Sequence, residues 1–354
     1  MAEPDAPASP TLADLTTLRL GGPIGRYVAV TGAELADAVG EADAAGEQVL
    51  VVGGGSNLVV ADEGFRGTVI QVTDEGVISA DGDTCGGELV TVGAGAVWDD
   101  VVARAVASGW VGVEALSGIP GTVGATPIQN VGAYGQEVAQ TIARVRVWDR
   151  TLRGVRTFAA ADCGFGYRTS RFKVDRRDPW GGRHVVLDVT FQLRHGELSA
   201  PIAYAELAHA LGVEVGERAP LAEVRAAVLG LRRGKGMVLD ADDHDTWSAG
   251  SFFTNPVIEP DRVPDGAPSY PQPDGTVKTS AAWLIEHAGF GKGFGLDRPG
   301  ARVSLSTRHT LALTNRGGAS ADELIDLARE VRDGVRDRFG ITLVNEPVLV
   351  GVEL

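Results

Sequence analysis

The stretch Gln48–Asn57, QVLVVGGGSN, joins a short apolar run directly to three consecutive glycines. The run QVLVV is typical of a buried strand. Upstream, Thr31–Glu34 matches a capping box that opens an alanine-rich helix, which Gly46 closes. A further short strand is predicted at Tyr27–Val30. The pattern therefore predicts a strand–helix–strand unit that ends in a glycine loop.

This first glycine loop is a candidate site for a diphosphate, because glycines without a Cβ let backbone N–H groups approach a ligand closely. No Lys-Ser/Thr pair follows it, so it is not a nucleotide-hydrolysing P-loop. A tight turn without a ligand is the alternative. A second candidate, GAGAVW, has Trp98 where a dinucleotide fingerprint requires glycine, and is rejected. The predicted contacts in the first loop are Gly53, Gly54, Gly55, Ser56 and Asn57.

A second glycine-rich stretch, GIPGTVGATPIQNVGAYG, occupies residues 118–135 and predicts an irregular loop. A loop of this length inside a domain is uncommon unless it wraps a ligand. Its amide and hydroxyl side chains suit the edge of a ring system. Two such loops favour a dinucleotide with a flat ring. The cofactor-binding candidates here are Gly118, Ile119, Pro120, Gly124, Gln129, Asn130 and Gly132.

The composition limits the classes of function. A chain of 354 residues suits two or three domains, and a net charge of −15 argues against a nucleic-acid partner. Cys85 and Cys163 lie far apart without CxxC spacing, so neither a disulfide framework nor a zinc site is expected. The acidic run Asp240–Asp245, which includes His244, matches no metal-binding loop and is interpreted as a solvated connector. No metal is expected.

No signal peptide is expected at the N-terminus. Residues 1–17 are predicted to be a disordered tail, without the basic start or apolar centre of a signal peptide. No apolar run of about 18 residues occurs, so no membrane span is expected. A monomeric cytoplasmic protein is the expectation.

Strands and helices are both predicted along the rest of the chain, which indicates an α+β fold. Ser320–Glu323 is a second capping box, which starts a long amphipathic helix that Gly340 stops. The C-terminal residues 341–354 alternate as a strand does. Further strands are predicted at 68–72, 89–92, 143–149 and 184–193, and helices at 97–107, 221–231 and 281–288.

Three side chains stand out as chemical candidates. Arg168, in the basic run GYRTSRFK, suits a carboxylate held by two parallel N–H bonds, with a surface ion pair as the alternative. Glu346 lies in an apolar terminal segment, where a carboxylate is desolvated unless paired, although a solvent-facing position is also open. Ser251, in WSAGSFFTNPV, lies between a flexible glycine and two phenylalanines, a setting that would hold a hydroxyl still and dry.

Six motifs in order closely resemble the UDP-N-acetylenolpyruvoylglucosamine reductases, the MurB family. The resemblance extends from about Leu18 to Gly351. The sequence PIAYAEL, with Tyr204, is similar to the tyrosine-bearing loop of the family's first type. The motifs are GGGSNLVV (53–60), GIPGTVGATPIQNVGAYG (118–135), GYRTSRFK (166–173), SAGSFFTNP (248–256), AAWLIEHAG (281–289) and NEPVLVG (345–351).

The resemblance implies a vanillyl-alcohol-oxidase-type (PCMH-type) FAD-binding domain of two subdomains, at 18–80 and 81–215. It also implies an α+β substrate-binding domain at 216–340 and a C-terminal strand at 341–354. The implied cofactors are non-covalent FAD and NADPH. The implied reaction reduces UDP-N-acetylglucosamine enolpyruvate to UDP-N-acetylmuramate, a peptidoglycan precursor needed for cell wall, cell shape and division.

The resemblance also implies roles for single residues. Ser251 matches the proton donor, and Arg168 with Glu346 would stabilise the charge that develops on the substrate carboxylate. The family's PEP is NEP here, so Asn345 leaves the aim of Glu346 open. The implied substrate contacts, with His309 as a substrate-adjacent residue rather than a general base, are Tyr134, Tyr204, Lys235, Asn255 and His309.

Two other functions are compatible with parts of the sequence. The first glycine loop alone would also suit a flavin oxidase of the same fold, but SAGSFFTNP and NEPVLVG speak against it. A non-catalytic nucleotide-sugar binding protein would have no use for a catalytic serine, arginine and glutamate together.

Overall fold

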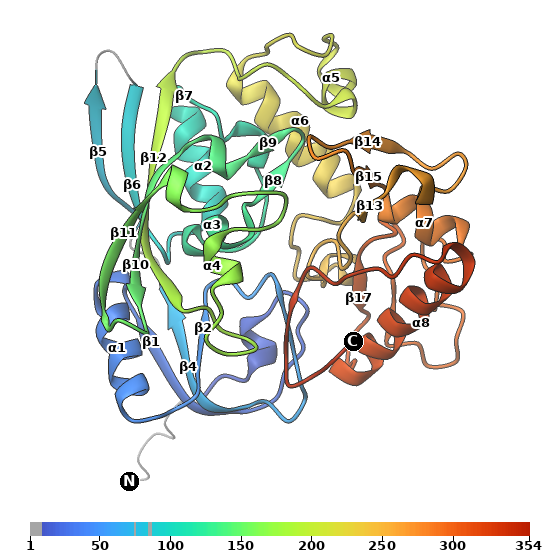
Figure 1. The fold of residues 1–354 in the computed structure, drawn as a ribbon, viewed down its shortest axis with the longest axis horizontal. Helices are drawn as coiled ribbons and strands as arrows, with labels where there is room; N and C mark the ends of the chain where they lie inside the picture. Colours follow the sequence, from blue (N-terminus) through green and yellow to red (C-terminus); the bar gives the residue numbers. More distant parts are fainter. Residues whose placement is uncertain (1–8, 74–75, 84–86) are drawn as a thin grey trace. The chain divides into compact units, whose positions relative to one another are not determined.

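The computed structural model describes residues 9–73, 76–83 and 87–354 (Figure 1). The described chain divides into two compact units. The sheet unit comprises Ile24–Gly54 and Arg66–Val238. The C-terminal unit comprises Leu239–Leu354 together with Gly55–Phe65 and the residues before Ile24. The first glycine loop therefore passes from one unit into the other between Gly54 and Gly55.

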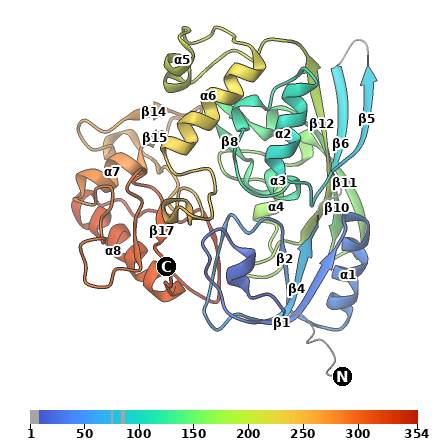
Figure 2. The same cartoon turned by 180° about the vertical axis from the view of Figure 1, so that it is seen from behind.

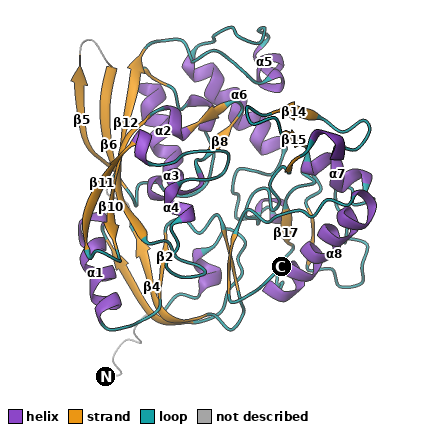
Figure 3. Cartoon of the chain, viewed as in Figure 1, coloured by secondary structure: helices purple, strands orange, loops and turns teal. Residues whose placement is uncertain are grey.

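A mixed set of long and short antiparallel strands forms the main sheet of the sheet unit, in the order β11-β10-β12-β6-β5, with β7 on the far end of β12 (Figure 3). The central strand β12, HVVLDVTFQLRH, has eight buried residues in succession, as expected for a strand covered on both faces. The strands are β5 (Val77–Asp83), β6 (Gly87–Gly93), β7 (Trp110–Val111), β10 (Ile142–Asp149), β11 (Gly154–Ala159) and β12 (His184–His195).

The predicted strand–helix–strand unit is present. It consists of β1 (Ile24–Val30), α1 (Gly32–Ala44) and β2 (Val49–Val52), and the capping box at Thr31 starts the helix. A later strand, β4 (Phe65–Val72), lies between β1 and β2 and runs parallel to β2. β2 is therefore an edge strand of this small sheet, and the glycines follow its carboxyl end.

Helices and short turns complete the sheet unit, and α2 and α3 lie beside the main sheet in both opposite views (Figures 1 and 2). The stretch 118–135, predicted to be irregular throughout, contains a 3-10 turn, a one-turn helix that begins beside Pro127, and a two-residue strand. The remaining elements are α2 (Trp98–Ala107), α3 (Thr126–Gln129), β8 (Gly132–Ala133), β9 (Gln136–Glu137), α4 (Arg171–Val174), α5 (Ala205–Leu211) and α6 (Leu221–Gly234).

The C-terminal unit is built around α8 (Ala321–Phe339), which the capping box at Ser320 starts and left-handed Gly340 ends. One face of α8 packs on α7 and on the hairpin β16–β17. A parallel pair, β3 with β18, belongs to the same unit. The other elements are β3 (Leu58–Val60), β13 (Val257–Ile258), β14 (Ser269–Pro271), β15 (Val277–Thr279), α7 (Ala281–His287), β16 (Val303–Leu305), β17 (Leu313–Asn315) and β18 (Val348–Val350).

The division into units differs from the predicted domain borders. The helix α6 belongs to the sheet unit, because Val224 and Val228 share a buried cluster with Leu207 and Ala208 of α5. Within 341–354 only β18 is a strand, since Pro347 precedes it and cannot donate to a ladder.

The predicted tail also differs from the structure. It lies outside the described residues as far as position 8, but Leu12–Leu15 form a 3-10 helix in which Leu12 is fully buried. Cys85 lies outside the described residues, and Cys163 is a buried free thiol whose pKa burial raises to about 11. Among the described residues, no helix combines the length and the apolar character needed to cross a membrane.

Candidate functional site

The two glycine-rich loops meet backbone to backbone in the sheet unit. A Cβ added at Gly53 would lie 2.2 Å from Oγ1 of Thr122, and one at Gly54 would lie 2.8 Å from Cα of Gly121. Side chains at either position would push the loops apart. The structure joins the two loops at these glycines, so together they form one continuous backbone surface.

Two more glycines of the second loop are fixed by the elements behind it. A Cβ at Gly118 would collide with Leu229 on α6, and one at Gly124 would collide with Ala94. The N–H of Gly118 donates to Asp99 at 2.6 Å. Two nitrogens of Arg225 also donate to Asp99, at 2.6 and 2.8 Å. Burial opposes ionisation of Asp99, but these hydrogen bonds hold its pKa below the usual value. The carboxylate thus anchors the start of the loop to α6.

Asn130 connects the second loop to the arginine-bearing turn. Its side chain is fully buried and donates to the carbonyl of Gly166 and to Glu137, both at 2.9 Å. Arg168 in turn donates through Nη2 to the carbonyl of Gly132 at 2.7 Å. The sequence analysis assigned Asn130 to the cofactor and Arg168 to a carboxylate. In the structure the Asn130 amide supports the loop, and the Arg168 guanidinium is anchored on backbone carbonyls.

The same region holds its backbone in an unusual conformation. Five described non-glycine residues have positive φ, and three of them, Asn130, Tyr134 and Arg168, are predicted site residues. Each left-handed non-glycine residue costs on the order of 1–3 kcal/mol and persists only where its surroundings impose it. The hydrogen bonds of Asn130 and Arg168 supply that constraint.

Three predicted substrate contacts lie together with two charged residues that the sequence analysis did not select. The rings of Tyr134 and Tyr204 pack edge to face with centroids 5.7 Å apart. The ammonium of Lys235 lies 5.6 Å from the centre of the Tyr134 ring and 2.6 Å from Glu206. Burial raises the pKa of Tyr134 to about 12, although the nearby charge of Arg232 opposes the rise. The Tyr134 phenol is therefore protonated at neutral pH and can donate a hydrogen bond.

Arg232 is the second cation of this cluster. Burial lowers its pKa, its Nη2 donates to the carbonyl of Met237 at 2.9 Å, and its buried Nε has no hydrogen-bond partner among the described residues. Arg232 and Lys235 stand three residues apart at the end of α6 and so share one face of the chain. The closely spaced cations of this face are visible in the sequence LRRGKG, residues 231–236.

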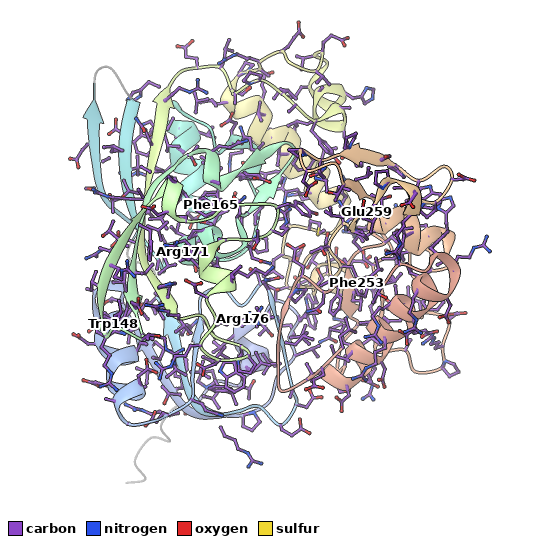
Figure 4. All side chains as sticks on the ribbon, viewed as in Figure 1. Trp148, Phe165, Arg171, Arg176, Phe253 and Glu259 are labelled. Atoms are coloured by element: carbon purple, nitrogen blue, oxygen red, sulfur yellow. The ribbon has the colours of Figure 1, made fainter. Side chains whose placement is uncertain are left out.

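Ser251 lies in an extended segment between two other segments of the C-terminal unit. Phe252 donates its N–H to the carbonyl of Leu311 at 2.7 Å, and its own carbonyl accepts the N–H of Glu346 at 2.8 Å. The two phenylalanines after the serine are almost fully buried and pack edge to face, and Phe253 is labelled in Figure 4. The structure therefore brings Ser251 and Glu346 onto neighbouring segments.

His309 lies against Ser251, with Nε2 at 3.5 Å from the serine Oγ. The loop before it is fixed by Asp245, which accepts hydrogen bonds from the N–H and hydroxyl of Thr307 and from Arg316. Asp245 is only 5% exposed, so the interpretation of the acidic run as a solvated connector is wrong at this residue. Burial opposes its ionisation, but these hydrogen bonds lower its pKa.

Two asparagines support the same segments. The Asn255 side chain accepts the N–H of Ala281 at 3.0 Å, which ties it to the start of α7. The Asn345 side chain donates to the carbonyl of Pro347 at 2.8 Å. This bond bridges the backbone on both sides of Glu346. Asn345 occupies the position where the family motif has a proline, and its side chain thereby restrains this turn.

The remaining predicted cofactor residues are distributed over both units. Gln129 is buried, and Ile119 packs on the core of the sheet unit. In the C-terminal unit the carbonyl of Asn57 accepts the N–H of Val348, and a Cβ at Gly55 would lie 1.8 Å from the carbonyl of Leu15. Among the described residues, no group of three or more His, Cys, Asp or Glu side chains is arranged to hold a metal ion.

These features fit a dinucleotide cofactor. The two joined loops are so close that a Cβ at Gly53 or Gly54 would collide with the second loop. In the second loop, Gly118 and Gly121 have positive φ. Such loops suit the diphosphate of FAD, because N–H groups in them can converge on an anion. In the other unit, a hydroxyl directly before two buried phenylalanines and beside an imidazole suits proton transfer.

Comparisons with known proteins agree with this chemistry. A family model described as an FAD binding domain matches residues 25–154. A second model, described as UDP-N-acetylenolpyruvoylglucosamine reductase, C-terminal domain, matches residues 242–350. The first match contains both joined glycine loops of the sheet unit, and the second contains Ser251 and Glu346. The α+β fold with an FAD-binding domain, expected from the sequence, is confirmed.

Curated relatives and a solved structure resemble nearly the whole chain. The UDP-N-acetylenolpyruvoylglucosamine reductase of Cutibacterium acnes is 60% identical over 341 residues, covering 96% of this chain and 89% of the relative. That of Thermobifida fusca is 57% identical over 357 residues, covering 97% of each. The crystal structure of the reductase from Thermus caldophilus aligns with a TM-score of 0.62 at 25% identity, covering 96% of this chain and 97% of that chain.

Proposed function

Because the chain belongs to the family of UDP-N-acetylenolpyruvoylglucosamine reductases, we propose that it reduces UDP-N-acetylglucosamine enolpyruvate to UDP-N-acetylmuramate. The observation that carries this proposal is the near-complete coverage of the chain by relatives of that name with more than half of their residues identical. The proposal includes NADPH as the source of the electrons. It also places the protein in the cytoplasm as a monomer, in the synthesis of the peptidoglycan precursors on which cell shape and division depend.

The first and second glycine loops would hold the cofactor without a covalent bond. Residues 53–57 and 118–132 supply the backbone, and Asp99 keeps the start of the second loop in place. When bound, FAD supplies two-electron chemistry, since it can accept a hydride from a nicotinamide and pass one to a carbon–carbon double bond. The remaining chemistry belongs to side chains of this chain.

Addition of a hydride to an enolpyruvyl group moves negative charge onto the adjacent carboxylate. Arg168 would stabilise this charge, because its guanidinium is already positioned by the carbonyls of Asn130 and Gly132 and need not reorganise. Glu346 would assist only in its protonated or paired form. Its backbone is positioned by the bond to Phe252 and by the bridge from Asn345.

The reaction then needs one proton at the neighbouring carbon. Ser251 would donate it from Oγ, and the two buried phenylalanines after it restrict the motion of the segment. A serine hydroxyl is a weak acid, so it can protonate only a strongly basic carbanion, such as the one that hydride addition creates. Tyr204, Lys235 and Asn255 would contact the diphosphate and sugar of the substrate, and Tyr134 would lie near the substrate or the flavin.

An anaerobic titration in two steps tests the function. The purified protein with FAD is mixed with NADPH until the flavin absorbance is bleached, and the enolpyruvyl nucleotide is then added without oxygen. The proposal predicts that the oxidised spectrum returns with one equivalent of the nucleotide. Recovery only on admission of oxygen would indicate an oxidase instead, and absence of bleaching would indicate a binding protein.

A further inference from the structure

Lys235 is already paired with an acid in the structure. Its ammonium lies 2.6 Å from Oε2 of Glu206, and the two side chains are 33% and 40% exposed. Glu206 lies in the first turn of α5, two residues after Tyr204, whereas Lys235 caps the C-terminal end of α6. The ion pair thus connects the tyrosine-bearing segment to the cationic end of α6.

The surroundings of this pair resemble an anion-binding site with an internal anion in it. Two cations, Lys235 and Arg232, and two phenols, Tyr134 and Tyr204, lie in this cluster with the carboxylate of Glu206, and Arg232 also interacts electrostatically with Asp99. The Arg232 guanidinium is buried, with an Nε that has no partner among the described residues. In a chain with a net charge of −15, such a concentration of positive charge requires a local explanation.

Stability does not provide that explanation. A partly exposed lysine–glutamate pair contributes little to folding, because solvent screens it and two long side chains lose freedom. The same pair matters for a ligand, since an anion that approaches Lys235 must first displace Glu206. A diphosphate carries more charge than the carboxylate it replaces, so it can complete this exchange. A neutral ligand gains nothing from it.

We propose that Glu206 occupies the place of a ligand diphosphate on Lys235, and that competition between the two sets the affinity and charge selectivity of the site for nucleoside diphosphates. The proposal rests on the proposed function, because that function assigns the sugar nucleotide to this cluster. Glu206 is in this view a specificity-determining residue. It lies on the same short segment as Tyr204.

Equilibrium binding to the FAD-loaded protein tests the competition without any turnover. UDP-N-acetylglucosamine, which lacks the enolpyruvyl group, and uridine serve as charged and neutral probes in calorimetric titrations. The variant Glu206→Gln keeps the shape of the side chain and removes its charge. Glu223→Gln, on the exposed face of α6, removes the same charge elsewhere and is the matched control.

We expect Glu206→Gln to bind UDP-N-acetylglucosamine about 2- to 5-fold more tightly than the parent, the range set by a partly exposed ion pair. Uridine affinity should be unchanged, and Glu223→Gln should match the parent for both probes. In the Lys235→Met background the affinity for UDP-N-acetylglucosamine should fall, and addition of Glu206→Gln should then have no effect. NADP⁺, which also carries a diphosphate, is titrated as a further probe.

Several results would overturn the proposal. Weaker binding by Glu206→Gln would mean that the carboxylate itself contacts the ligand. An effect equal to that of Glu223→Gln would mean that only the net charge of the protein changes the affinity. A gain that persists without Lys235 would exclude competition for this ammonium, and a gain for NADP⁺ alone would assign the cluster to the nicotinamide cofactor. The proposed reduction has a separate readout, because it is measured by flavin absorbance and not by binding of this inert nucleotide.

Discussion

Replacement of Gly54 by alanine tests whether the contact between the two glycine loops creates the cofactor site. The added Cβ would lie 2.8 Å from Cα of Gly121 and 3.4 Å from the neighbouring backbone C and N atoms. Carbon atoms pack favourably at about 3.5–4.0 Å, so the overlap is severe. Both partners are backbone and no flexible side chain can yield, so the two loops must separate or the protein must bear the strain.

Overpacking of this kind costs about 1–3 kcal/mol. Strain retained in the apoprotein would lower its melting temperature, by about 2–4 °C per kcal/mol for a unit of this size. Strain relieved by separation of the loops would appear instead in cofactor affinity, because FAD must bring them together again. If the whole cost moves there, the dissociation constant for FAD rises about 5- to 150-fold.

Two measurements on the same samples separate the loss of apoprotein stability from the loss of FAD affinity. Thermal unfolding of the apoprotein gives the first part, and quenching of flavin fluorescence on titration with apoprotein gives the second. The control is Gly154→Ala in β11, where the nearest atom to the added Cβ is 4.0 Å away and φ is not positive. If Gly54→Ala and Gly154→Ala agree within about 0.5 kcal/mol in both measurements, the contact between the loops does not build the site.

Three other predictions follow from buried charges and from the anchored arginine. Asp245→Asn should destabilise the protein by about 2–4 kcal/mol in urea unfolding, because the Thr307 loop loses a charged acceptor, whereas an unchanged midpoint would contradict this. Burial opposes ionisation of Asp149, but hydrogen bonds from Arg183 and from the N–H groups of Leu152 and Thr151 lower its pKa to about 2. The unfolded chain therefore binds more protons than the folded chain as the pH falls from about 4 to 2; about 2 kcal/mol of stability should be lost there, and Asp149→Asn should lack that slope. Arg168→Lys should slow flavin reoxidation by the enolpyruvyl nucleotide at least about 100-fold, since a lysine cannot bond the Gly132 carbonyl and a carboxylate in one plane; a smaller effect would assign Arg168 to structure.

Local sequence signals predicted much of the fold. The capping boxes at Thr31 and Ser320 located the starts of α1 and α8, because their side chains satisfy N–H groups within the same turn. The strands β5 and β11 were missed. The first contains Gly82 and acidic residues, and the second is exposed over most of its length, so neither shows the apolar pattern of a strand.

The candidate site was less accessible from sequence, because its contacts join distant positions. The approach of His309 to Ser251 spans 58 residues, and no local pattern encodes it. The role of Asp245 was misread for the same reason, since its partners lie on a loop about 60 residues away in the chain. The family motifs selected Ser251 and Glu346 separately, and only the backbone pairing in the structure shows that their segments are neighbours.

The role of Ser251 is tested most directly by the two half-reactions of Ser251→Ala, followed separately by stopped-flow absorbance without oxygen. We expect flavin bleaching by NADPH at nearly the rate of the parent protein, and flavin recovery with the enolpyruvyl nucleotide slowed about 100- to 10,000-fold, the range of a lost general acid. Equal slowing of both half-reactions, or recovery at the parental rate, would contradict proton donation by this serine.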